Sequence, residues 1–507
     1  MDTTFLPTDT PGMSRFPLAQ RSMTAGILTV VLLAAPPRLS LGARLAPSAL
    51  EYVGAFRLPP DAGEPPATWD WGGQAMTYVP GGDPDGPADG FPGSLLVTGF
   101  DGECLVAEIT IPAPTMDRDP AILPAAAFLQ PFSDVRGGLF PTFTELPRAG
   151  IEWLPAQPGE AGPHIWLTWG QHYQEPGPEV APTHARCDLD LGNPRTEGAW
   201  WVGTASENEA GLIYAVNDYL FAIPTSWAAA HTGGRALATG RFRDGGWSGM
   251  GPELVAIGPW LEGDPPPPET ELPYTPLIRY SVANRGPHRL DGYSAADEWS
   301  GGAWIESGSG SAVVFAGTRG SGYTWYGFQT PADVPPAPGW PEGAPCVYTV
   351  GDVMCVRPDG ETPCTEEDMA PCRDADVEEE SRGWWASSFD AVLLLYDPEE
   401  LAAVAEGREE PWKPQPYAVL DVDRTLLGRP LSEDAAVYLG RGNQRHTRLG
   451  AAAFDRERGI LWILEPFGNG AAPVVHAWRI RRRSARRPAG RTGRTVRVVA
   501  ATGSASD

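Results

Sequence analysis

The stretch that decides the fold is residues 150–170, where the apolar segment GIEWLP (150–155) is followed by a second apolar segment, HIWLTWG (164–170). A small residue opens a short strand, the chain turns, and another strand follows. The pattern occurs four more times, at 73–80 with 94–100, 211–216 with 219–223, 301–307 with 312–318, and 451–455 with 459–465. Strand pairs that bury little alone need neighbouring units to complete their hydrophobic contacts. The repeats predict an all-β protein, a β-propeller in which five blades are favoured within a range of five to seven.

The domain boundaries follow from this pattern. We expect the propeller to occupy residues 44–480, and the strand at 52–58 to pair with the strand at 474–480, which would close the ring without an exposed edge. The 60 Gly and 55 Pro residues are spread between strand-like runs, as tight turns require.

Residues 1–43 have the features of a secretory signal peptide. Arg15 and Arg21 precede the apolar run AGILTVVLLAA (25–35), which Pro36 ends and which is too short to span a bilayer. Met13 would begin a signal peptide of more usual length and is a candidate true start. The expected location is therefore secreted or periplasmic, with an uncleaved membrane anchor as the alternative.

The six cysteines suit an oxidising compartment. Four of them lie close together in an acidic insertion at 330–386, which has too few large apolar residues to fold without cross-links. We expect two disulfides among Cys346, Cys355, Cys364 and Cys372, and a third between Cys104 and Cys187. Zinc is the weaker alternative because the spacings lack paired C-x2-C motifs.

Charge is segregated along the chain. The net charge of −26 divides into +8 for residues 479–507, which hold nine Arg, and −34 for the remainder. The acidic body disfavours nucleic acid and other polyanions as partners. The basic tail at 481–507 is expected to be disordered, with contact to an anionic surface as the alternative.

The repeats locate candidate catalytic carboxylates. When they are aligned, the position before the large apolar residue is apolar in four copies and is Glu152 in the fifth. A carboxylate there must be paired or face water, since burying a lone charge costs several kcal/mol. With Glu306 and Asp101, Glu152 is a candidate for acid and base roles. Calcium is a candidate ion for the acidic insertion or for the propeller axis.

Tryptophan is abundant, with 19 residues in the chain. Aromatic rings stack on sugar faces, although they also pack blades together. The candidate ligand-binding residues are Trp69, Trp71, Trp166, Trp169 and Trp325.

The segment 397–407 is expected to form a short helix between blades. Asp397 can cap it, Pro398 suits its first turn, and Gly407 can end it. The segments LEYVGAFRLP (50–59), GECLVAEITIP (102–112) and LLLYDPEELAAVAEG (393–407) resemble a group of uncharacterised exported bacterial β-propeller-like proteins. This resemblance implies secretion and the fold, and it carries no assigned activity.

Three functional hypotheses follow. The favoured one is a monomeric exported binding module that recognises a carbohydrate or a protein through its axial face and its Trp-bearing loops. The second is a glycoside hydrolase or lyase that uses axial carboxylates. The third is a structural or interaction protein of the cell envelope.

Overall fold

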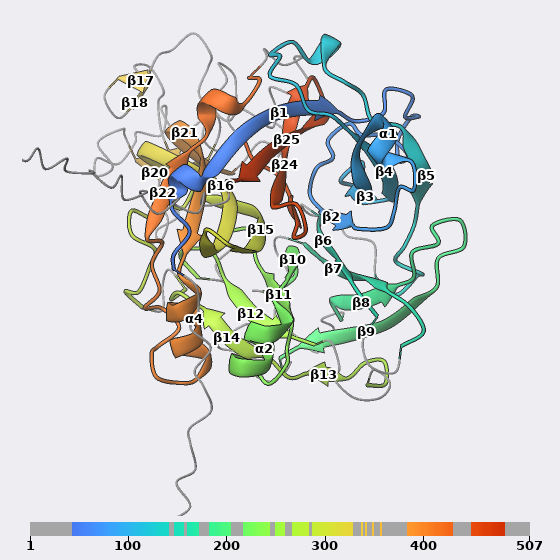
Figure 1. Cartoon of the computed structure of the whole chain (residues 1–507). Coiled ribbons are helices and arrows are strands. Elements are labelled where there is room, and N and C mark those ends of the chain that lie inside the picture. The colour runs from blue at the N-terminus through green and yellow to red at the C-terminus, as the bar shows by residue number, and fades with distance from the viewer. Residues whose placement is uncertain are drawn as a thin grey trace, which may run out of the picture. The chain divides into compact units, whose positions relative to one another are not determined.

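The computed structural model describes residues 43–140, 147–156, 160–171, 182–203, 216–243, 249–258, 266–282, 286–327, 383–428 and 448–481, with four two-residue strands between 336 and 356. In this part of the chain the strands form five antiparallel sheets arranged as a five-blade β-propeller (Figure 1). The predicted all-β propeller is confirmed, with five blades.

Each blade has four main strands, named here from the axis outward. The innermost strands are β2 (Met76–Val79), β6 (Pro147–Leu154), β10 (Tyr219–Ala222), β15 (Glu298–Ser307) and β23 (Ala452–Asp455). The second strands are β3 (Gly90–Thr98), β7 (His164–Gln171), β11 (Leu237–Gly240), β16 (Gly310–Gly327) and β24 (Ile460–Asn469). The third strands are β4 (Val106–Pro112), β8 (His184–Cys187), β12 (Leu254–Ile257), β21 (Gly383–Tyr396) and β25 (Ala472–Ile480). The outermost strands are β5 (Phe128–Ser133), β9 (Thr196–Val202), β14 (Thr275–Ile278), β22 (Ala418–Asp421) and β1 (Leu50–Arg57).

The innermost strands form a closed ring. β2 contacts β6 and β23, β10 contacts β6 and β15, and β15 contacts β23. The fifth blade is completed from the other end of the chain, because β1 pairs antiparallel with β25 from Leu50 opposite Ile480 to Arg57 opposite Val474. The predicted closure by the N-terminal strand is confirmed.

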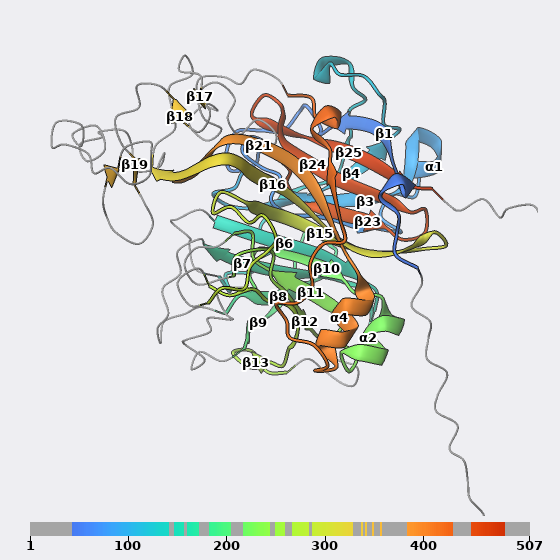
Figure 2. The same cartoon turned by 90° about the vertical axis from the view of Figure 1, so that its left-hand side faces the viewer.

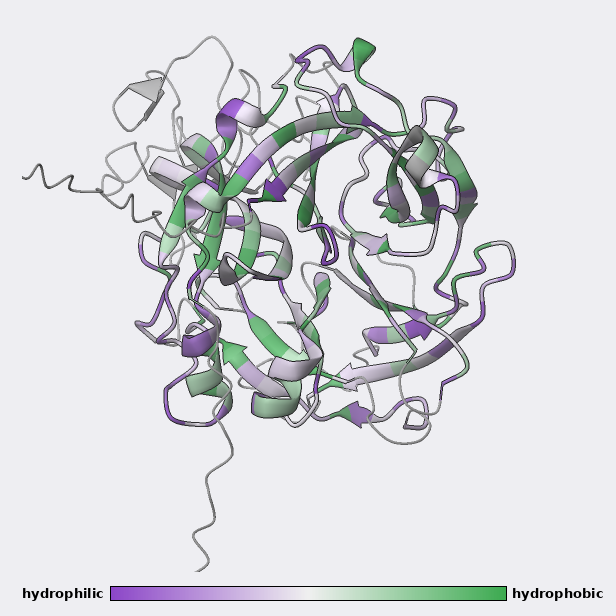
Figure 3. Ribbon diagram, in the orientation of Figure 1, coloured by the Kyte–Doolittle hydropathy of each residue, from purple (hydrophilic) through white to green (hydrophobic). Residues whose placement is uncertain are grey.

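Apolar side chains fill the spaces between blades rather than one central core. Alternate residues of a strand enter different clusters, as the two-residue period of a strand requires. Tyr219 and Phe221 pack between the third and fourth blades, whereas Leu220 and Ala222 pack between the second and third. Figure 3 shows these apolar residues along the strands and hydrophilic residues in many connections. Because both faces of most blades are covered, the strands read as continuous apolar runs.

The sequence prediction misplaced one strand of the third blade. The repeat pattern assigned 219–223 as the second strand, but β10 is innermost and its partner is β11, with Tyr219 opposite Gly240. Asn217 and Asp218, which resemble a turn between two strands, instead precede β10 directly. Residues 211–215 lie outside the described residues.

The predicted helix is present as α4 (Pro398–Ala405), and the Asp397 side chain accepts from the backbone N–H of Glu399. It joins the third and fourth strands of one blade instead of two blades, and it packs against β14 of the neighbouring blade. With α2 (Thr225–His231), it lies on the side of the propeller away from the projecting end of the long β16–β21 hairpin (Figure 2).

The other helical elements are short. They are α1 (Gly86–Asp89) and the 3-10 turns Pro47–Ala49, Pro120–Ile122 and Asp423–Thr425. In the described residues no helix has the length and apolarity needed to cross a membrane.

The remaining strands are two residues long. β13 (Glu271–Leu272) runs parallel to β9, and β17 (Pro336–Ala337) pairs with β18 (Trp340–Pro341). β19 (Val347–Tyr348) pairs with β16 and with β20 (Cys355–Val356).

The predicted disulfide between Cys104 and Cys187 is wrong, because both thiols are free and buried. The Cys104 thiol instead donates to the backbone carbonyl of Asp101, with a sulfur to oxygen distance of 3.3 Å. Burial raises the pKa of Cys104 to about 12 and that of Cys187 to about 11.

The other predicted cross-links are not seen in the described residues, and they stay predictions. Cys346, Cys364 and Cys372 lie outside those residues, and Cys355 is placed only as part of β20. The proposed signal peptide, apart from residue 43, and the basic tail beyond residue 481 lie outside them as well.

Candidate functional site

Arginines converge at the axial end where the innermost strands begin. Arg148 is the second residue of β6, Arg243 follows the end of β11, and Arg448 precedes β23. We call these three residues the arginine cluster. Because innermost strands begin where second strands end, residues from three blades meet at this end of the axis.

Arg148 is the unusual member of the arginine cluster. Its guanidinium carbon lies 3.8 Å from the centre of the Phe242 ring, a cation–π contact. Among the described residues, the Arg148 side chain makes no hydrogen bond and no ion pair, and its buried Nε has no partner. Burial and the positive charges of Arg448 and Arg243 lower the pKa of Arg148 to about 10. The negative charges of Glu298 and Asp218 act in the opposite direction and raise it. Arg148 is therefore still protonated at neutral pH.

The other two members of the cluster share one carboxylate. Glu298, the first residue of β15, is 4 % exposed. Its two oxygens lie 3.3 Å from Arg243 Nη1 and 2.7 Å from Arg448 Nη2. One carboxylate thus serves two guanidinium groups, and among the described residues it forms no ion pair with Arg148.

Two aspartates border the cluster. Asp218 accepts from the backbone N–H of Phe242 at 2.9 Å, which fixes the segment that carries the ring under Arg148. Burial raises the pKa of Asp218, although Arg241 opposes this shift. Burial also raises the pKa of Asp101, against the nearby charges of Arg148 and Arg448. Both aspartates therefore hold their negative charge less firmly than exposed ones do, and they offset the arginine cluster less.

The opposite end of the axis is held by hydrogen bonds between innermost strands. The Glu152 carboxylate accepts from the Thr77 hydroxyl and from the backbone N–H of Ala222, each at 2.9 Å. Arg456 donates to the backbone carbonyl of Trp304 at 2.9 Å and to that of Ala222. These groups, which we call the axial bridge, connect all five blades.

Glu152 in the axial bridge is partly exposed and close to a positive charge. Burial raises the pKa of Glu152 to about 7, while Arg456, Thr77 and the N–H of Ala222 lower it. Its position fits the expectation that a carboxylate at this place is paired or faces water. The bonds indicate that Glu152 joins blades.

One of the three predicted catalytic carboxylates, Asp101, lies apart from the other two. Glu152 and Glu306 both interact with the charge of Arg456 at one end of the axis. Asp101 instead lies near Arg148, which is four residues from Glu152 along β6, or about 13 Å at the rise of a strand. Glu152 and Glu306 are therefore grouped at one end of the axis, and Asp101 is grouped with the arginine cluster.

The candidate tryptophans lie mostly in the interior. Trp69, Trp166 and Trp169 are 1–2 % exposed, and Trp69 stacks on Phe128 with ring centres 5.6 Å apart. These rings pack blades and have no free face for a sugar. Trp71 is partly exposed beside Phe467, with ring centres 5.5 Å apart. The side chain of Trp325 lies outside the described part of the chain.

No cluster of three or more His, Cys, Asp or Glu residues suited to a metal ion occurs in the described residues. Calcium in the insertion or at the axis stays a prediction.

The sequence analysis missed the arginine cluster. One local signal existed, since Arg241, Phe242 and Arg243 (RFR) follow an apolar strand in an otherwise acidic body. Arg148 and Arg448 carry no such signal, because each is a single arginine, one at the start of an innermost strand and the other before one. Only the closed ring brings them together.

Comparison of the chain with protein-family models gives no match, and comparison with curated protein sequences gives none either. The geometry of the described residues is therefore the basis for inferring function.

Proposed function

We propose that this propeller is a binding module for a carbohydrate that carries a carboxylate group, with the carboxylate held by the arginine cluster. The observation that carries the proposal is Arg148, a protonated guanidinium with no hydrogen bond or ion pair among the described residues. A guanidinium in a partly buried site offers several N–H donors, and a carboxylate can accept two of them side by side.

The charge of the rest of the protein limits the ligand. A body of net charge −34 repels long polyanions, whereas one carboxylate near the axis meets mainly the local field of the arginine cluster. The proposed ligand is therefore a saccharide with one or a few acidic residues. Trp71 is partly exposed beside Phe467 of β24, and its backbone N–H donates to the carbonyl of Ala471 in the turn after β24. We propose that its ring covers a sugar ring of the ligand.

Calorimetric titration of the purified chain with glucuronate, galacturonate and their short oligomers, beside the uncharged parent sugars, tests the proposal. We expect the uronates alone to bind, and Arg148→Gln to weaken binding roughly 10- to 100-fold, as for a lost charged hydrogen bond. Arg195→Gln is the matched control, because Arg195 is a surface arginine with an 81 % exposed side chain. Equal binding by Arg148→Gln, or binding of acidic peptides in place of uronates, would contradict the proposal.

A glycoside hydrolase is the second candidate. It is favoured by the two aspartates with raised pKa, Asp101 and Asp218, which lie at the same end as the ion-paired Glu298. A carboxylic acid with a raised pKa near a second carboxylate is the arrangement that such hydrolysis uses. Release of reducing sugar by the wild-type chain and its loss in Asp101→Asn would support this candidate over a binding module.

Export remains part of the proposal. It rests on the charged start and apolar run before residue 43 and on the resemblance to exported bacterial proteins. Expression of the full chain in a bacterial host, followed by fractionation and N-terminal sequencing, tests it. A mature N-terminus near residue 43 in the periplasm or medium is expected, and an intact N-terminus in the cytoplasm would contradict it.

A further inference from the structure

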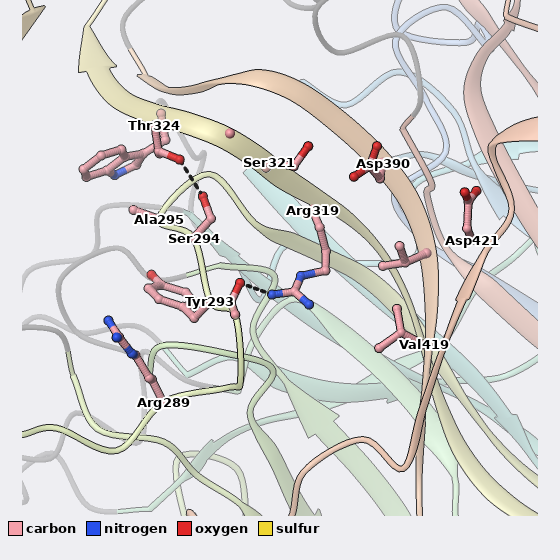
Figure 4. A pocket seen from close by; sticks show the side chains of 15 residues that line it. Arg289, Tyr293, Ser294, Ala295, Arg319, Ser321, Thr324, Asp390, Val419 and Asp421 are labelled. Atoms are coloured by element: carbon pink, nitrogen blue, oxygen red, sulfur yellow. Dashed lines mark hydrogen bonds between the residues drawn. The ribbon is translucent and has the colours of Figure 1, made fainter. Parts of the chain in front are cut away.

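A hollow lies away from the arginine cluster, on the side of the fourth blade that faces the third. It has a volume of about 730 Å³ and is lined by β16, β21, β22 and the segment 289–295 (Figure 4). We call it the blade cleft. Its volume falls within the range of pockets that bind small molecules.

Successive side chains at β15 and along β16 face alternately toward the axis and toward the blade cleft, so the two places are lined by different residues. Glu298 points to the arginine cluster, whereas the preceding residue, Asp297, pairs with Arg319, with 3.5 Å between Oδ2 and Nε. Thr318 likewise accepts from the backbone N–H of Leu449 near the axis, while Arg319 enters the cleft. Neighbouring residues on a strand face opposite sides of its sheet.

The floor of the blade cleft is rigidly built. The buried Asp297 accepts from the backbone N–H groups of Gly320 and Ser294, at 2.9 and 3.1 Å. The hydroxyls of Ser294 and Thr324 lie 3.0 Å apart and tie the segment to β16 (Figure 4). A Cβ at position 320 would lie 2.8 Å from the Ala296 Cβ, so only glycine fits there without a shift. The cleft is therefore formed before any ligand arrives.

The walls of the cleft combine aromatic rings with unused polar groups. Tyr293 and Trp384 are both partly exposed lining residues. In the described residues, the side chains of Arg289 and Asp390 make no hydrogen bond or ion pair, while Asp421 accepts only from the N–H of Asp423. Figure 4 shows Arg289 and Tyr293 on one side of Arg319 and the two aspartates on the other.

This chemistry selects a neutral polyhydroxylated ligand. Sugar hydroxyls can donate to Asp390 and Asp421 and accept from Arg289, and the C–H face of a sugar ring can cover an aromatic ring. The carboxylates of Asp390 and Asp421 disfavour an anion. The Arg319 guanidinium beside them does not offset their charge, because it already bonds to Asp297 and to the carbonyls of Asp291 and Gly292. We propose that the blade cleft is a binding site for a neutral saccharide, independent of the arginine cluster.

The test is a titration of the full chain with a panel of neutral oligosaccharides made of glucose, galactose, mannose, xylose or N-acetylglucosamine. We expect at least one of them to bind, and Trp384→Ala and Asp390→Asn each to weaken that binding about tenfold or more. Glu271→Gln is the matched control for the carboxylate, because Glu271 is exposed on β13 in another blade. Asp390→Asn keeps the side-chain shape, so it remains informative if Trp384→Ala fails to fold.

Arg148→Gln separates this proposal from the proposed axial site. Neutral sugar binding that persists in Arg148→Gln and is lost in Asp390→Asn supports the blade cleft, whether or not any uronate binds. Absence of binding to every sugar of the panel, unchanged binding in both cleft variants, or loss of binding only in Arg148→Gln would overturn it.

Discussion

The guanidinium of Arg148 lies over the ring of Phe242, with 3.8 Å between its carbon and the ring centre, and no carboxylate pairs with it among the described residues. Such a charge is costly to hold in a partly buried place, and a protein that needed only packing there would use an apolar side chain. This contact therefore predicts that the charge of Arg148 serves the function of the protein and not the stability of its fold.

Replacement of Arg148 by Met keeps a long side chain against Phe242 and removes the charge. We expect the free energy of unfolding to stay equal or to rise by about 1 kcal/mol, as for other buried charges replaced by apolar groups. Arg448→Met should instead destabilise the fold by about 1–3 kcal/mol, because buried Glu298 loses its closer partner. Urea unfolding of both variants measures this, and a large loss of stability in Arg148→Met would indicate a structural role for Arg148.

The axial bridge predicts a pH dependence of stability. The pKa of Glu152 is raised to about 7, so between pH 4.5 and 7 the folded state holds a proton that the unfolded state releases. The contribution of Glu152 to the free energy of unfolding is therefore fully present below pH 4.5. It is lost as the pH rises through 7, and the loss is about 3 kcal/mol at most. Glu152→Gln should remove this part of the slope, which urea unfolding at several pH values between 4 and 8 would show. The same slope in both proteins would contradict the assignment.

The closing strand β1 is held by a buried hydrogen-bond chain. The Tyr52 hydroxyl lies 2.9 Å from His476 Nδ1, and His476 Nε2 lies 2.7 Å from the Glu465 carboxylate. Tyr52→Phe leaves a buried ring nitrogen without a partner and should cost about 1–2 kcal/mol in thermal unfolding. Glu51→Gln, which changes an exposed pair on the same strand, should leave the melting temperature unchanged. Equal melting of Tyr52→Phe and the wild type would show that the chain does not stabilise the closure.

The two buried cysteines predict a labelling pattern. With pKa values of about 12 and 11, Cys104 and Cys187 are protonated at neutral pH and shielded from reagents. Iodoacetamide should modify neither in the folded protein and both after unfolding without a reductant, as peptide mass spectrometry would show. A Cys104–Cys187 peptide pair in the unreduced digest would contradict the free thiols.

The sequence predicted most of the fold because its strands and its helix follow from local sequence patterns. Apolar runs such as ILWILE at 460–465 are buried strands, and Asp397 with Pro398 begins a helix. The misplaced strand at 219–223 shows the limit. A strand's position in its blade depends on its partner, and β11 begins only after an intervening helix.

The candidate sites were less predictable. Glu152 stood out as a carboxylate at an apolar position of the repeat, and the structure gives it a bridging place. Trp69, Trp166 and Trp169 stood out only by residue type, and burial assigns them to packing. A tryptophan occurs both in cores and in binding sites, so composition could not separate packing residues from ligand-binding residues.

By itself, the sequence determined an array of strand pairs, with five blades favoured, and its closure by the N-terminal strand. Alternation and turns act between residues close in the chain, and the terminal strands complete one blade. Only the tertiary structure decided where charge gathers. Arg148 and Arg448 are 300 positions apart, and no local pattern links them. They meet because each stands near the start of an innermost strand, and the ring brings those starts to one end of the axis.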